Sequence, residues 1–65
     1  MRVKMRFDSL IFVGLSAEQI EDVEYHADKC VMVIDESGGV QVRGKQENLY
    51  TLLFNLSVTY DLEVL

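Results

Sequence analysis

The beginning of the chain alternates between basic and apolar side chains. Residues 2–7 follow this alternation without a break, which is typical of a β-strand with one buried face and one solvated face. The apolar run 10–13 comes after Asp8 and Ser9, and it either continues the strand past a bulge or returns as the second strand of a hairpin. Because Asp-Ser lacks the glycine that two-residue hairpin turns favour, we expect the continuing strand.

A helix start follows Gly14. Ser16 is a favourable N-cap residue, and Gln19 completes a capping box. Apolar residues at positions 20, 23 and 27 then lie on one helical stripe. Residues 22–28 also show some alternation, so a strand over these residues is the alternative to the helix.

The second half of the chain has the patterns of a hairpin, a helix and a closing strand. The apolar run 30–34 and the alternating segment 40–44 flank a turn rich in glycine and acidic residues, which predicts a β-hairpin whose first strand is buried on both faces. Leucines recur at helical spacing within residues 45–56 and indicate an amphipathic helix with a wide apolar face. Residues 58–64 alternate again and predict a last strand.

This order of elements predicts a small α+β domain. The order β-α-β-β-α-β commonly folds as a ferredoxin-like two-layer sandwich, with both helices on one face of a four-stranded antiparallel sheet. No linker or repeat divides the chain, so residues 1–65 are expected to form a single domain. If residues 22–28 form a strand, the alternative is a β-rich meander with one C-terminal helix.

The small size of the chain limits its stability. A folded chain of 65 residues buries only about 61% of the surface that its extended form exposes. Domains of this size usually gain stability from disulfides, a metal, a cofactor or a partner. Cys30 has no second cysteine to pair with, and one cysteine with one histidine cannot supply the ligands of a structural zinc site. We therefore expect no cofactor, and we expect a protein partner, with a homo-oligomer as the simplest case.

Charge and hydropathy indicate the expected compartment. The formal net charge is −5, and most acidic residues lie in the middle of the chain. No apolar run approaches the ~20 residues of a bilayer-spanning helix, and the first residues lack the apolar stretch of a secretory signal. We expect a soluble protein with a cytoplasmic location and no membrane partner.

Two charged surfaces are candidates for partner binding. In the ferredoxin-like order the first and third strands are neighbours, so their outward residues would form one partly basic face on the side of the sheet without helices. This candidate face consists of Arg2, Lys4, Arg6, Gln41 and Arg43. It carries no aromatic side chain for base stacking, and the negative net charge opposes attraction to nucleic acid, so direct nucleic-acid binding is not expected. The candidate acidic surface on the first helix consists of Glu18, Glu21, Asp22 and Glu24.

Candidate catalytic and metal-binding patterns are weak. His26 and Cys30 would share a helical face if the first helix reached that far, but this spacing is common, and Cys30 begins a strand that is expected to be buried. Residues 39–45 partly match a phosphate-binding loop, yet Gln46 stands where that motif requires a magnesium-binding hydroxyl. We expect no catalytic residue and no metal site, and therefore a protein that is not an enzyme.

These patterns favour a non-catalytic protein–protein interaction or regulatory module that acts as a homodimer. The alternative is a small acidic inhibitor that mimics the charge of nucleic acid and blocks a nucleic-acid-binding protein. That alternative requires carboxylates clustered on one surface, whereas a stable and cooperatively folding monomer would argue against the homodimer.

Overall fold

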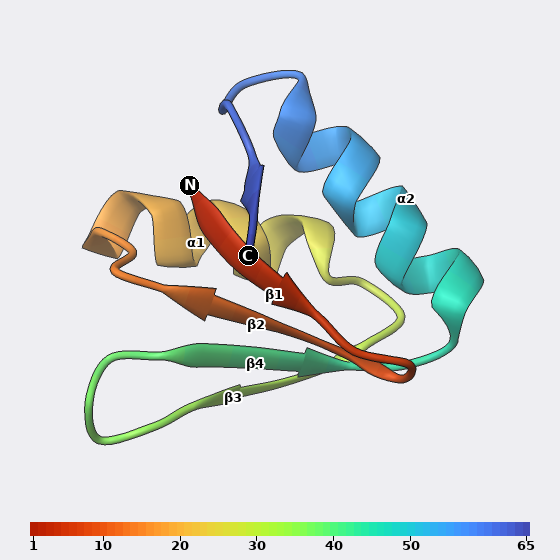
Figure 1. Cartoon of the computed structure of the whole chain (residues 1–65), viewed down its shortest axis with the longest axis horizontal. Coiled ribbons are helices and arrows are strands. Elements are labelled where there is room, and N and C mark those ends of the chain that lie inside the picture. The colour runs from red at the N-terminus through yellow and green to blue at the C-terminus, as the bar shows by residue number, and fades with distance from the viewer.

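A five-stranded sheet forms one layer of the protein, and two helices form the other (Figure 1). The computed structural model describes all 65 residues. Its elements are β1 (Arg2–Met5), β2 (Ser9–Val13), α1 (Ala17–His26), β3 (Val31–Ile34), β4 (Val40–Arg43), α2 (Gln46–Ser57) and β5 (Glu63–Val64). The strand order is β3-β4-β2-β1-β5, in which β1 and β5 are parallel and the other neighbours are antiparallel. The chain is therefore a small α+β domain with a mixed sheet.

The second apolar run does not continue the first strand but returns beside it. The Arg6 amide donates a hydrogen bond to the Ser9 carbonyl (2.9 Å), and Met5 pairs with Leu10 in the antiparallel register. The expected continuing strand is wrong, and the alternative hairpin is present, with its turn at Phe7 and Asp8 rather than at Asp8 and Ser9. No non-glycine residue has a positive φ, so the reversal at residues 7–8 does not require a glycine. Pairing β2 on both sides and burying its apolar side chains outweighs the preference for glycine in the turn.

The additional strand changes the sheet from the ferredoxin-like order. β1 lies between β2 and β5, so the sheet has five strands rather than the expected four, and one pair of neighbours is parallel. The closing strand is also shorter than predicted, because only Glu63 and Val64 of the expected range 58–64 pair with β1.

Both predicted helices are present. At the start of α1 the Gln19 amide donates to the Ser16 hydroxyl (3.2 Å) and the Ser16 amide donates to the Gln19 side chain (2.9 Å), which confirms the capping box. Because α1 continues to His26, the alternative strand over residues 22–28 is wrong, and the β-rich meander is wrong with it. α2 covers the predicted amphipathic segment and buries three of its leucines.

Neither helix combines the length and the apolar composition that crossing a bilayer requires.

Both helices pack on the same face of the sheet. The cross-strand partners Val3 and Phe12 point to one side, as do Leu10 and Val42, and all four are buried. The hydrophobic core joins these residues to the inner sides of α1 and α2, and it consists of Val3, Leu10, Phe12, Val23, Ala27, Val40, Val42, Leu49, Leu52 and Leu56. The opposite face of the sheet, which we call the open face, carries no helix.

β3 is an edge strand and is more exposed than predicted. The exposed fractions of Val31, Val33 and Ile34 are 65%, 50% and 52%, so the expected burial on both faces is wrong. The reason is the position of the strand at the edge of the sheet, where β4 is its only neighbour. No element covers Val31 and Val33 on the open face, and Ile34, on the helix side, lies outside the core. The apolar run indicates the strand itself but not its surroundings.

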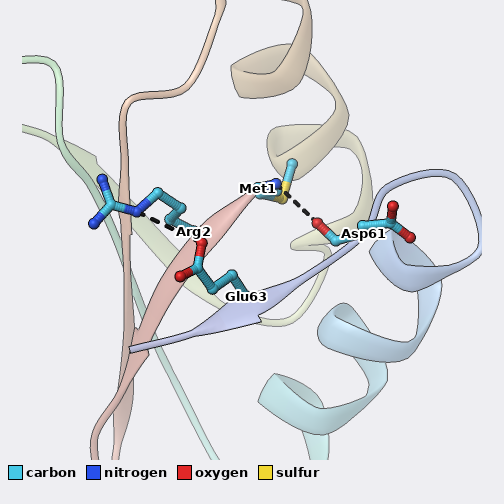
Figure 2. Close-up of polar contacts among 4 residues, drawn as sticks. All are labelled: Met1, Arg2, Asp61 and Glu63. Atoms are coloured by element: carbon cyan, nitrogen blue, oxygen red, sulfur yellow. Dashed lines mark hydrogen bonds and ion pairs between the residues drawn. The ribbon is translucent and has the colours of Figure 1, made fainter.

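The C-terminal strand is attached to β1 mainly by backbone contacts. The Glu63 amide donates to the Met1 carbonyl (2.8 Å), and the Met1 ammonium donates to the Asp61 carbonyl (2.8 Å). The Arg2 Nε atom lies 3.9 Å from Oε2 of Glu63. Figure 2 marks this ion pair and the hydrogen bond from Met1 to Asp61 with dashed lines. Because the side chains of Arg2 and Glu63 are both exposed, their ion pair contributes little to stability.

The contribution of the capping box can be measured with Ser16→Ala. This change leaves the Gln19 amide without its side-chain acceptor, so we expect the free energy of unfolding, measured by urea denaturation, to fall by about 1 kcal/mol. Ser57→Ala is the matched control, because the Ser57 hydroxyl donates only to the Phe54 carbonyl near the end of α2. We expect that control to change stability by less than about 0.5 kcal/mol. Equal losses in the two variants would argue against a specific role for the cap.

Candidate interaction surface

The open face of the sheet mixes apolar and basic side chains. Its residues lie in rows of cross-strand partners that point to the same side. The rows are Arg2 with Val13; Lys4 with Ile11, Gln41 and Val33; and Arg43 with Ser9 and Val31. Ile11 and Val13 are half-buried, and Val31 and Val33 are exposed. This face is therefore apolar along β2 and β3 and basic beside them.

The predicted basic face is divided into two parts. Arg2 and Lys4 lie on β1, and Gln41 and Arg43 lie on β4, all on the open face. β2 separates the two pairs because the hairpin inserts this strand where the ferredoxin-like order has direct neighbours. Arg6 lies beyond the end of β1 and lines a small hollow between the hairpin and α2. The basic side chains thus flank the apolar residues of β2, and partner binding to this face stays a prediction.

The outer edge of β3 presents unpaired backbone groups. The Asp35 amide donates to the Gly39 carbonyl (2.9 Å), so these two residues form a hydrogen-bonded pair of the β3–β4 ladder. Because such pairs alternate with non-hydrogen-bonded pairs, Val33 also bonds to β4, whereas the N–H and C=O groups of Met32 and Ile34 point away from the sheet. No strand lies beyond β3, and its sequence contains neither a charge nor a proline to protect the edge.

The hairpin turn after β3 carries a fixed negative charge. One carboxylate oxygen of Asp35 accepts hydrogen bonds from the Ser37 amide (2.9 Å), the Ser37 hydroxyl (2.7 Å) and the Gly39 amide (2.8 Å). The Ser37 side chain and the Gly39 amide are the main causes that lower the pKa of Asp35. The Asp35 carboxylate therefore keeps its charge to a lower pH than an ordinary aspartate does.

A second apolar surface lies on the outer side of α2. Tyr50 and Phe54 are one helical turn apart and are 55% and 70% exposed. Phe7, at the tip of the β1–β2 hairpin, is also exposed and lines the same small hollow as Tyr50. The sequence carries a signal for these positions, because both aromatic residues of α2 lie beside the leucine stripe rather than on it.

The residues of the predicted acidic surface have two kinds of surroundings. Glu18, Glu21 and Glu24 are exposed on α1. Asp22 is half-buried and accepts a hydrogen bond from the Tyr60 hydroxyl, which connects α1 to the segment before β5. Asp22 thus has a structural contact that the pattern of charges does not reveal.

The contact between Tyr60 and Asp22 makes stability depend on pH. The hydrogen bond to Asp22 raises the pKa of Tyr60 to about 12, and burial and the negative charges of Asp22 and Glu18 act in the same direction. Because the folded-state pKa is raised, the stabilisation is complete below the ordinary phenol pKa of about 10. It is lost as the pH rises from about 10 towards about 12.

Urea denaturation between neutral pH and pH ~11 tests this contact. We expect wild type to lose stability across the alkaline part of this range and Tyr60→Phe to lose less, starting from a lower stability at neutral pH because its hydrogen bond is absent. Tyr25→Phe is the control, since Tyr25 is exposed and its ring packs at a right angle to the His26 ring. Identical alkaline profiles for wild type and Tyr60→Phe would contradict the predicted dependence.

His26 and Cys30 line one polar cleft between the end of α1 and α2. The cleft has a volume of about 230 Å³ and is lined by His26, Asp28, Lys29, Cys30, Asn48, Thr51 and Asn55. Burial raises the pKa of the Cys30 thiol, whereas an activated nucleophile needs a lowered pKa. The Cys30 Sγ atom also lies only 3.1 Å from the place where a Cβ at Gly44 would be, so the thiol packs against that glycine. No group of three metal-ligating side chains converges in the structure. These contacts favour a packing role for Cys30.

Alkylation with iodoacetamide distinguishes a packed thiol from an activated one. At mildly alkaline pH we expect Cys30 in the folded protein to react at least ~10-fold more slowly than in urea, because partial burial disfavours the thiolate. His26→Ala is expected to leave the folded-state rate unchanged. A fast reaction that His26→Ala slows would instead indicate an activated cysteine and would overturn the packing interpretation.

Comparison of the chain with protein-family models, with curated proteins and with solved structures gave no match. No function can therefore be transferred from a relative. The surfaces described above, namely the open face, the outer edge of β3 and the outer side of α2, are the observations from which function is inferred.

Proposed function

We propose that the protein is a non-catalytic protein–protein interaction module that acts as a homodimer. The exposed apolar surface is the observation that carries this proposal. Eleven large hydrophobic side chains are exposed, compared with ten hydrophobic residues in the core. Single exposed apolar side chains are common, but three of these lie together on β3 and two lie one turn apart on α2, and such patches mark interaction sites.

The one-sided core gives a physical reason for association. The two helices cover one face of the sheet, so the side chains of Val31 and Val33 have no cover within the chain. A second copy that removes these side chains from water would add the apolar burial that a domain of this size lacks. Tyr50 and Phe54 lie on the helical layer and would remain available to a further protein.

The alternative function, a small acidic inhibitor that mimics nucleic acid, has less support. Mimicry requires carboxylates arranged on one surface, as phosphates are along a strand. The exposed acids of α1 meet this requirement, but the other acidic residues lie on separate elements. Asp8 is at the first hairpin, Asp35 and Glu36 are at the second, and Glu63 lies beside Arg2 on the open face.

Light scattering and thermal unfolding test the homodimer. Between about 1 and about 100 μM protein, we expect the measured mass to rise from 7.5 kDa towards twice that value and the melting temperature to rise with concentration, because dimerisation stabilises the folded chain. A constant mass of 7.5 kDa with cooperative unfolding that does not depend on concentration would overturn the homodimer.

A further inference from the structure

The free edge of β3 is complementary to itself. Its unpaired N–H and C=O groups belong to Met32 and Ile34, which lie symmetrically on either side of Val33. In an antiparallel arrangement with its two-fold axis at Val33, Met32 of one copy faces Ile34 of the other. Every outward backbone group of these two residues then has a hydrogen-bond partner.

We propose that the homodimer proposed above forms by this pairing, so that β3 of each copy joins the two sheets into one continuous sheet. The two Val33 side chains face each other on the open face, at the cross-strand distance at which apolar pairs stabilise a sheet. On the other face, Ile34 of one copy lies beside Met32 of the second copy. Half-exposed apolar side chains at the edge are thus covered without burying a charge.

The charges at the two ends of β3 also fit an antiparallel pair. Lys29 precedes the strand and Glu36 follows it, and both are exposed. Antiparallel pairing brings the beginning of one strand beside the end of the other, so Lys29 of each copy lies beside the turn of the second copy that carries Asp35 and Glu36. Asp28 adjoins Lys29 and reduces this attraction, but the pairing occurs twice because of the two-fold symmetry.

Other ways of joining two copies fit the surfaces less well. Stacking two open faces would place Arg2, Lys4 and Arg43 of both copies in one interface and would bring like charges together. The basic open face of one copy could instead dock on the acidic α1 of a second copy. Because these surfaces lie on opposite sides of the domain, such a pair would still have one open face and one α1 uncovered. Such an arrangement adds copies without closing and gives filaments rather than a dimer.

Val33→Lys tests the position of the interface. It places two ammonium groups opposite each other at the two-fold axis, and we expect the dimer Kd measured by analytical ultracentrifugation to rise by about 100-fold or more. Circular dichroism should show that the variant is folded, because Val33 is half exposed at the edge of the sheet. Val58→Lys, at an exposed position outside the sheet, and Lys4→Glu, on the open face away from β3, are controls that should leave the Kd within about threefold of wild type.

Charge reversal tests the antiparallel register. Lys29→Glu and Glu36→Lys should each weaken their own homodimer by about tenfold, because each places like charges together twice. An equimolar mixture of the two variants should recover an affinity near wild type as a heterodimer, since both contacts then join opposite charges.

The results of these experiments distinguish pairing through β3 from the formation of a homodimer in general. A wild-type chain that stays monomeric overturns the homodimer and the β3 pairing together. A wild-type dimer that Val33→Lys does not weaken keeps the homodimer but overturns pairing through β3. Loss of the dimer in Val33→Lys without recovery in the mixed charge variants overturns the register centred on Val33.

Discussion

β2 is the strand on which the rest of the structure depends. It is the central strand of the sheet, with β1 on one side and β4 on the other, and its Leu10 and Phe12 side chains are almost completely buried under the helices. The strand reaches this position because the chain reverses at residues 7–8 and returns antiparallel to β1. This single reversal gives the sheet its fifth strand, moves β5 to the outer side of β1, and separates the basic residues of β1 from those of β4.

The elements that could be predicted are those whose signals are local. The capping box of Ser16 and Gln19, the glycine-rich turn between β3 and β4, and the leucine stripe of α2 each depend on residues within a few positions of one another. The reversal before β2 has no such signal, since residues 7–8 include no glycine and adopt no positive φ. The direction of β2 depends on its pairing with β4, which lies about thirty residues later in the chain. A pattern within a short stretch of sequence does not contain the energy of that pairing.

The alternation of apolar and polar residues predicts only part of the candidate surface. Alternation correctly assigns Arg2, Lys4, Gln41 and Arg43 to the side of the sheet away from the core. It cannot show that β3 is an edge strand, because an apolar run of this kind is typical of a strand covered on both faces. Whether such a run is buried depends on how many elements remain to cover it. A chain with two helices, both on the same face, has nothing left for the outer side of β3.

The properties of β3 connect the small size of the chain to its proposed role. Edge strands of monomeric proteins are usually protected by a charge that points inward, a proline, a bulge or a covering element, and β3 has none of these. The opposite edge differs, because β5 is only two residues long and its Glu63 carries a charge beside Arg2. One edge of the sheet is therefore closed to further pairing while the other is open. An arrangement with one open edge favours a dimer that closes on itself over a chain of copies, since two open edges would be needed to extend the sheet further.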